Sequence, residues 1–169
     1  QDLRDFLETC QTKQGSIYIS TAGATTIAAQ ANVTSNSLTN MVAVETGGTF
    51  TLSVAPTANE FDMNTDGQLR YTGTPTTNVF FTASVMLELV TSGVDLELVM
   101  AVTKGGTIVT GAKTGGFGPR VTTNSVPMSV SGFTSMATND YLNIFVGNVD
   151  STVNVVARMA QLTAFSLVT

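Results

Sequence analysis

The sequence of 169 residues contains no histidine, no tryptophan and a single cysteine. Without histidine, neither a Ser-His-Asp nor a Cys-His nucleophilic site can form, and histidine-ligated zinc is excluded as well. The single cysteine, Cys10, permits neither an intrachain disulfide nor a thiolate metal cluster. The glycine-rich motifs GxxxxGKS/T and GxGxxG, which hold nucleotide phosphates at the start of a helix, are also missing. We therefore expect no bound cofactor.

Charged residues are scarce as well. Asp, Glu, Lys and Arg make up 11% of the chain, and the net charge is −5. Lysines and arginines do not cluster anywhere, so a groove that follows the phosphates of a nucleic acid is not expected. The mean hydropathy of +0.25 is high for a soluble monomer. No run of about 18 apolar residues is present, so a membrane-spanning helix is not expected either. We expect contacts between subunits to cover the surplus apolar surface.

Carboxylates are the remaining candidates for catalysis. Glu88, Asp95 and Glu97 lie in two successive predicted strands, and Glu88 would approach Glu97 if those strands formed a hairpin. A glycosidase needs two carboxylates about 5–9 Å apart, and burial raises the pKa of one of them. Because all three residues alternate with apolar neighbours, we expect a solvated outer face and no catalytic residues.

A short acidic segment matches the start of a calcium-binding loop. Asp62, Asn64 and Asp66 occupy alternate positions before Gly67, and their oxygens could ligate a hard cation. The twelfth position of the pattern is Gly73, however, so the bidentate glutamate is missing. We predict a plain turn between two strands and keep a calcium site as the alternative.

The first residues of the chain have the periodicity of a helix. Their apolar side chains recur at i, i+3, i+4 and i+7: Leu3, Phe6, Leu7 and Cys10. Asp2 suits an N-cap and Gly15 suits a helix end. The pattern predicts a short amphipathic helix over residues 3–13, within an N-terminal arm of residues 1–14. Its apolar face would either cap the end of the following domain or anchor the chain to a larger assembly.

From Gly15 onward the pattern has period two, which predicts one domain of strands over residues 15–169. The strand candidates are Ser16–Ser20, Thr25–Ala28, Met41–Glu45, Thr49–Val54, Phe61–Met63, Gln68–Thr72, Val79–Val90, Val94–Thr103, Thr107–Thr110, Val126–Phe133, Tyr141–Val146 and Val153–Leu167. Gly105 and Gly106 predict a tight hairpin, Ser92-Gly93 predicts a second turn of this kind, and residues 111–119 predict a long loop. Many short antiparallel strands without an internal helix indicate an all-β sandwich or jelly roll.

Several apolar residues are predicted to point outward. Phe80 and Phe81 are adjacent in one strand, so one of them faces away from the core. Tyr71 and Phe165 are further candidates for a contact between subunits, although each of these aromatic residues taken alone is more often part of an ordinary core. Smaller apolar residues also fall on outward phases: Val99, Ala101 and Val156. Together these residues favour an oligomer interface.

Four segments, in this order, resemble a pattern in virion surface proteins of marine bacteriophages and of large algal or amoebal DNA viruses. They are Asp66–Gly73 with the following Val79–Val85, Val102–Thr107, Met136–Val146 and Leu162–Phe165, so the resemblance covers roughly residues 60–169. Gly105 stands where the family usually has asparagine. The resemblance implies an antiparallel jelly roll like those of tumour necrosis factor (TNF) and C1q, usually a homotrimer displayed on a capsid, spike or fibre head. It brings no catalytic residues.

The sequence therefore predicts a viral structural protein on the capsid surface. Its expected partners are its own copies, other capsid proteins and, for its loops, a host glycan or protein. The predicted helix would contact the capsid lattice. One alternative is a minor or major capsid subunit that builds the shell itself. Another is a carbohydrate-binding module of a secreted protein, although three tyrosines and no tryptophan provide little aromatic surface for a sugar.

Overall fold

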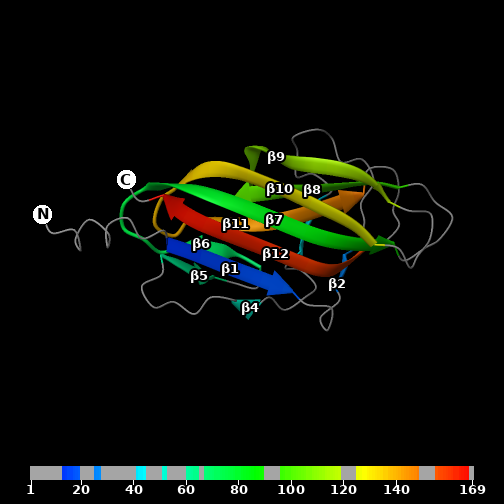
Figure 1. Cartoon of the computed structure of the whole chain (residues 1–169), viewed down its shortest axis with the longest axis horizontal. Coiled ribbons are helices and arrows are strands. Elements are labelled where there is room, and N and C mark those ends of the chain that lie inside the picture. Colours follow the sequence, from blue (N-terminus) through cyan, green and yellow to red (C-terminus); the bar gives the residue numbers. More distant parts are fainter. Residues whose placement is uncertain are drawn as a thin grey trace, which may run out of the picture.

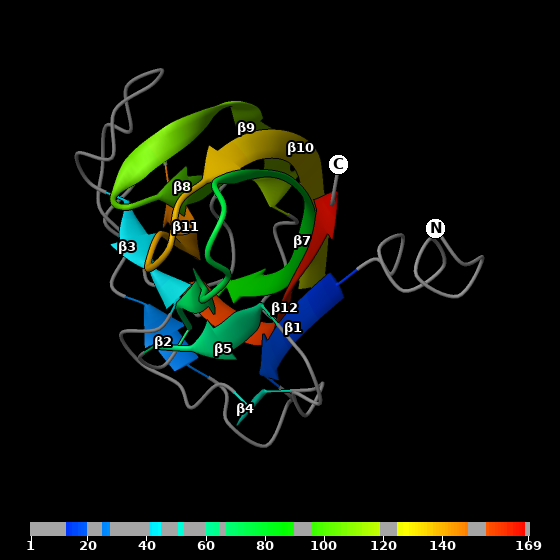
Figure 2. The same cartoon turned by 90° about the vertical axis from the view of Figure 1, so that its left-hand side faces the viewer.

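The structure is a computed structural model in which nearly every described residue belongs to a β-strand. It describes residues 13–19, 25–27, 41–44, 51–52, 60–64, 67–89, 96–118, 125–148 and 155–167. Two antiparallel sheets pack face to face (Figure 1), and the view along the strands shows both layers (Figure 2). Among the residues described, no helix is long and apolar enough to cross a membrane.

Each sheet has six strands. Sheet A has the order β10, β7, β12, β1, β4, with β2 paired to β12, and sheet B has the order β5, β6, β11, β8, β9, with β3 paired to β11. The strands of sheet A are β1 (Lys13–Ile19), β2 (Thr25–Ile27), β4 (Thr51–Leu52), β7 (Thr77–Leu89), β10 (Ser125–Met136) and β12 (Val155–Leu167). Those of sheet B are β3 (Val42–Ala43), β5 (Phe61–Met63), β6 (Leu69–Tyr71), β8 (Leu96–Lys104), β9 (Thr107–Gly118) and β11 (Tyr141–Asn148). Successive long strands repeatedly change sheet, which is the topology of a jelly roll.

The core lies between the two sheets and follows from strict alternation along the strands. In β7, the inward residues are 0–3% exposed: Val79, Phe81, Ala83, Val85 and Leu87. Leu98, Met100 and Val102 of β8 line the opposite wall. Burying one large apolar side chain contributes about 1.5–3 kcal/mol, so this layer is the main source of stability.

Local turn chemistry predicts the β8–β9 hairpin correctly. Gly105 and Gly106 have φ angles of 54° and 82°, and Lys104 pairs with Thr107 across the turn. Two successive positive φ angles give the type I′ geometry, whose twist matches that of the flanking strands. The predicted hairpin is confirmed.

Two of the predicted connections are wrong. Strands β7 and β8 do not form a hairpin at Ser92-Gly93, because β7 pairs with β10 and β12 while β8 pairs with β9 and β11. Glu88 and Glu97 therefore lie in different sheets. The predicted loop over residues 111–119 is largely strand, since β9 continues to Gly118. Gly111, with φ of 77°, lies at a shift in register and lets β9 kink without ending.

The structure describes only the last two residues of the predicted N-terminal arm, Lys13 and Gln14, and both are in a strand. Strand β1 begins at Lys13, two residues before the predicted start of the β domain. Residues 1–12 lie outside the described residues, and so do the four proposed anchor residues, Leu3, Phe6, Leu7 and Cys10.

Candidate interaction face

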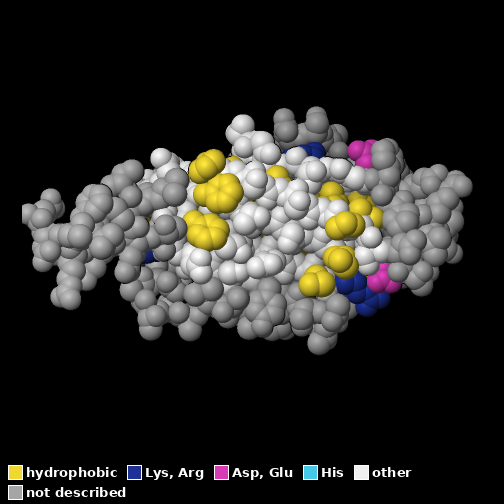
Figure 3. All heavy atoms as spheres, in the orientation of Figure 1, with side chains coloured by type: hydrophobic (Ala, Val, Ile, Leu, Met, Phe, Trp, Pro, Cys, Tyr) yellow, Lys and Arg dark blue, Asp and Glu magenta, His cyan; other side chains and the backbone are white. Residues whose placement is uncertain are grey.

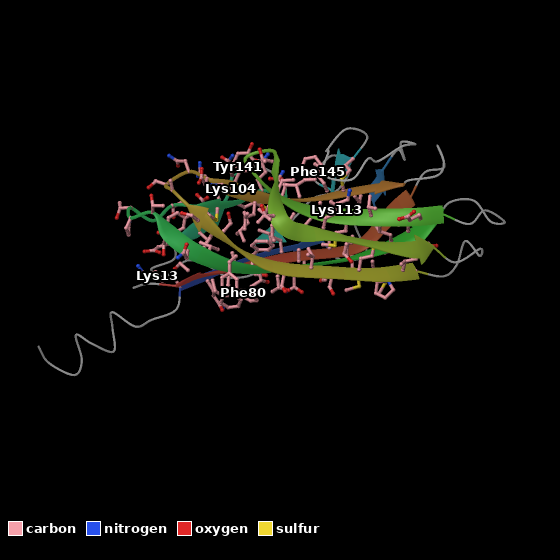
Figure 4. All side chains as sticks on the ribbon, turned by 90° about the horizontal axis from the view of Figure 1, so that it is seen from above. Lys13, Phe80, Lys104, Lys113, Tyr141 and Phe145 are labelled. Carbon is pink, nitrogen blue, oxygen red and sulfur yellow. The ribbon has the colours of Figure 1, made fainter. Side chains whose placement is uncertain are left out.

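Three phenylalanines lie side by side on the outer face of sheet A. Phe80 of β7 is paired with Phe133 of β10 on one side and with Phe165 of β12 on the other. The ring centroids of Phe80 and Phe133 are 5.0 Å apart, and those of Phe80 and Phe165 are 6.3 Å apart. Phe133 is 63% exposed. Figure 4 shows Phe80 pointing away from the core. We call Phe80, Phe133 and Phe165 the aromatic cluster.

The outer face of sheet A has no charged residue over four successive rows of β10, β7 and β12. The aromatic cluster is the first row, and two rows of small polar residues follow it: Ser131, Thr82 and Thr163, then Ser129, Ser84 and Gln161. The fourth row consists of Pro127, Met86 and Met159, of which Met159 is 48% exposed. The space-filling view shows apolar groups at both ends of this face, with polar side chains between them (Figure 3).

An ion pair ends this uncharged face. Between Ala157 and Met159, β12 shifts register against β7, so Arg158 is an extra residue in β12 and its Nε donates to Glu88 Oε2. The hydrogen bond from Arg158 lowers the pKa of the Glu88 carboxyl and raises the pKa of the Arg158 guanidinium. The two charges compensate each other at the boundary of the face.

The structure divides the predicted interface residues into two groups. Phe80 and Phe165 belong to the aromatic cluster on the outer face and are half-buried, whereas Tyr71 and Phe81 are 0% exposed and lie inside the sandwich. Tyr71 and Phe81 therefore cannot touch a neighbouring subunit directly, and they are wrong as interface residues. The prediction that one of Phe80 and Phe81 faces outward is confirmed.

Sequence reasoning missed Phe133, although its signal is present. In β10, Phe133 shares its outward phase with serines and one proline, so an aromatic residue there has no place in the core. The next inward position is Gly132, where a Cβ would lie 2.9 Å from Phe81 Cζ. A glycine at this point makes room for Phe81 beneath the aromatic cluster.

The outward apolar residues of sheet B have a different explanation. Val99 and Ala101 are 5% and 0% exposed and pack against Met41, with Ile108 and Phe145 beside them. The chain itself covers these residues. Val156, in sheet A, is 9% exposed. None of the three offers a free apolar surface, so the prediction that they mark a subunit interface is wrong.

A polar network closes one end of the sandwich around Tyr71. The hydroxyl group of Tyr71 donates to Pro75 O at 2.9 Å and lies 3.3 Å from Glu60 Oε2, which also accepts a hydrogen bond from Ser166 Oγ at 3.2 Å. Lys13 forms an ion pair with Glu60. Burial and, secondarily, the charge of Glu60 raise the pKa of Tyr71 to about 12. The network joins β1, β6 and β12, so its role is structural.

The same network accounts for Gly73, the residue that breaks the calcium pattern. A Cβ at Gly73 would lie 2.2 Å from the Tyr71 hydroxyl oxygen. Only glycine leaves room for the tyrosine ring here, and this explains the Tyr71-Thr72-Gly73 segment in packing terms.

Arg70 binds two of the three residues of the candidate calcium site, Asp62 and Asn64. Arg70 donates through Nε and Nη2 to the two carboxylate oxygens of Asp62, at 2.8 and 2.6 Å, and through Nη1 to Asn64 Oδ1 at 3.1 Å. Asp66 lies outside the described residues. Within the described ranges, no group of three or more His, Cys, Asp or Glu residues could hold a metal ion. The predicted strand, turn and strand are confirmed, since β5 pairs with β6 around this turn.

Comparison with known proteins identifies the fold. No protein-family model and no curated protein sequence matches the chain. The Eiger TNF structure from S. frugiperda is similar with a TM-score of 0.58 and 10% identity, over 92% of both chains. PRD1 vertex protein P5 is similar with a TM-score of 0.55 and 12% identity, over 92% of this chain and 96% of that one. The globular domain of zebrafish complement 1qA gives a TM-score of 0.48 and 13% identity, over 93% and 98%. The chain has a TNF-like jelly-roll fold, as predicted.

Proposed function

We propose that the chain is a non-enzymatic protein of the virion surface and that it forms a homotrimer through the outer face of sheet A. The aromatic cluster is the observation that carries this proposal. Phe133 is 63% exposed, and two further phenylalanines stand beside it on a face without charge. Exposed apolar groups of this kind mark contact sites, and aromatic residues dominate the energy of such contacts.

The face has the composition of an interface beyond the aromatic cluster. Charged residues are depleted at the centre of protein interfaces, while aromatic residues and methionine are enriched. Sheet A follows this rule, with phenylalanines at one end, Met86 and Met159 at the other, and the Glu88–Arg158 pair at the border. At the apolar coefficient of about 25 cal/mol per Å², covering an exposed phenylalanine contributes about 2–3 kcal/mol, which applies to Phe133. Phe80 and Phe165 are already half-buried in the folded chain, so covering the rest of their surface contributes less.

The assignment to a virion is supported by the sequence segments that resemble virion surface proteins. The structure gives several of their residues a place in the fold: Gly73 beneath Tyr71, Gly105 in the β8–β9 turn, and Asn139, with φ of 72°, in the turn before β11. The TNF-like fold is shared with a protein described as a vertex protein of PRD1. We propose decoration of the capsid, or a spike or fibre head, with the N-terminal arm facing the particle.

Solution mass is the decisive test. Light scattering should give three times the 17.6 kDa of one chain. Replacing Phe80 and Phe165 together by serine should give a folded monomer, because both side chains are outside the core. Tyr141→Ser is the matched control on the outer face of sheet B and should remain trimeric.

Other outcomes separate the alternatives. A native protein that is monomeric at all concentrations would refute the trimer, as would a trimer that survives the double substitution unchanged. Assembly beyond three copies would favour a shell subunit. For the virion assignment, antibodies against the purified chain should label the surface of intact particles from cells that produce it, and labelling of secreted protein alone would contradict it.

A further inference from the structure

Edge strand β9 of sheet B passes edge strand β10 of sheet A at the seam between the two sheets (Figure 2). Residues of β8, β9 and β10 line a shallow pocket there. Its volume is about 240 Å³. Both sheets contribute to its walls, which are formed by Lys104, Thr107, Ile108, Val109, Thr110, Phe133 and Thr134. Three threonine hydroxyl groups and one lysine ammonium group therefore surround a single concave site.

The ammonium group of Lys104 in this pocket is held in place by neighbouring residues. Lys104 Nζ donates to Ser135 O at 2.9 Å and lies 3.4 Å from Asp140 Oδ2, while its side chain remains 36% exposed. Asp140 Oδ2 also accepts the backbone N–H of Ala137 at 2.9 Å. An ammonium group has three donors, and these contacts engage two of them. The third can serve a ligand without rearrangement of the turn.

The remaining walls suit a molecule with many hydroxyl groups. Thr107 and Thr110 are exposed, and Thr134 is half-buried beside them. Each threonine hydroxyl can donate one hydrogen bond and accept others, which matches the needs of a sugar hydroxyl. Ile108 borders the pocket and offers apolar surface to the C–H groups of a sugar ring. Phe133 also borders the pocket, and in the proposed trimer its exposed surface is shared with the subunit contact. A drug-sized ligand needs a pocket of about 300–1,000 Å³, so this one suits a single ring.

We propose that this pocket binds one anionic sugar residue, a pyranose that carries a carboxylate or a sulfate group. Lys104 would take the anionic group, and the threonines would bind the ring hydroxyls. The inference goes beyond the proposed trimer. Most of the pocket belongs to β9 of sheet B, so a contact through sheet A places it at the border between subunits.

The experiment uses the full chain in the assembly state that it adopts. Sodium glucuronate, glucose 6-sulfate and glucose are each titrated into ¹⁵N-labelled protein, and backbone amide shifts are followed by NMR. We expect the two anionic sugars to shift the amides of residues 104–110 and 133–134. A ligand of about 13 non-hydrogen atoms at ordinary ligand efficiency binds with a dissociation constant of about 1 mM. Glucose should bind at least about tenfold more weakly, because it lacks the charged hydrogen bond.

Substitutions then test the residues. Lys104→Gln should weaken binding of both anionic sugars about tenfold and leave glucose unchanged. Because Lys104 also bonds to the turn before β11, Thr110→Val is the second variant, an isosteric change at an exposed position that should weaken all three sugars. Lys113→Gln removes an equal charge from the neighbouring strand β9, outside the pocket, and should bind like the native protein.

The possible results test the sugar site and the proposed trimer separately. Shifts outside the pocket, equal binding of glucose, or equal losses in Lys113→Gln and Lys104→Gln would each refute the sugar site, as would no shift with any probe. Light scattering on the same samples reports the trimer separately. A monomer that binds anionic sugars supports the site and refutes the trimer, and a trimer that binds none does the reverse.

Discussion

Replacing Tyr71 by phenylalanine should change the pH dependence of stability at alkaline pH. Tyr71 is 0% exposed, and its hydroxyl bonds to Pro75 O at 2.9 Å. Burial, with Glu60 nearby, raises its pKa to about 12, whereas a tyrosine in an unfolded chain has a pKa of about 10. Between these two values the unfolded state has lost its proton and the folded state has kept it. Stability therefore falls as pH rises through this range.

The magnitude follows from proton linkage. The free energy of unfolding of the native chain should fall by about 1.4 kcal/mol per pH unit, or about 2.7 kcal/mol over the two units. Below about pH 10 the protonated Tyr71 makes its full contribution to the free energy of unfolding, and above about pH 12 this contribution is lost. The phenylalanine variant lacks this dependence but also lacks the hydrogen bond to Pro75, which contributes about 1 kcal/mol. The native chain should be more stable by that amount at pH 8, equal near about pH 11, and less stable at higher pH.

Urea unfolding, followed by circular dichroism at a series of pH values, measures the two free energies. The other two tyrosines, Tyr18 and Tyr141, are present in both proteins and contribute equally to both free energies, so the difference reports on Tyr71. A difference that stays constant from pH 8 to about pH 11.5 would refute the reasoning, because it would mean that Tyr71 titrates alike in both states. A variant that is more stable at every pH would contradict the hydrogen bond to Pro75.

Three further predictions test the packing, the turn and the acidic segment. Gly15→Ala should lower the free energy of unfolding by about 2–3 kcal/mol in urea, since its Cβ would lie 2.4 Å from Phe61 Cβ; a loss below about 0.5 kcal/mol would contradict this packing. Gly105→Ala should lower it by only about 1–2 kcal/mol, because φ is +54° but nothing lies within 4 Å; an unchanged midpoint would speak against the turn geometry. Calorimetric titration with calcium chloride should give no binding heat, since Arg70 already occupies both carboxylate oxygens of Asp62, and a stoichiometric heat would show that calcium displaces the arginine.

The sequence predicts local structure well because local structure depends on neighbouring residues. Alternation with period two places β5 at Phe61–Met63, as observed, and two glycines place the β8–β9 turn. Sheet membership depends on distant pairing and could not be predicted. Strand β7 joins sheet A because β10 and β12, both far along the chain, take its two edges. The expected hairpin between β7 and β8 fails for this reason.

The residues proposed for the interaction face also divide into those whose position the sequence predicts and those whose position depends on distant segments. Alternation predicts that either Phe80 or Phe81 faces outward, and the structure agrees. It cannot predict that Tyr71 is buried, because the residues that enclose its hydroxyl come from segments on both sides of it, among them Glu60 and Ser166. The position of Tyr71 is a property of the assembled end of the sandwich.

Alternation along a strand shows which side chains point outward, but not whether another part of the chain covers them. Whether an outward apolar side chain is covered decides where an interface can lie. Both sheets place apolar residues on their outer faces. In sheet B, Val99 and Ala101 are already covered by Met41 and its neighbours, so a second copy would gain little apolar contact there. In sheet A, Phe133 keeps 63% of its surface exposed after the chain has folded. The free energy available for association is therefore concentrated on sheet A, where covering the aromatic cluster removes apolar surface from water without burying a charge.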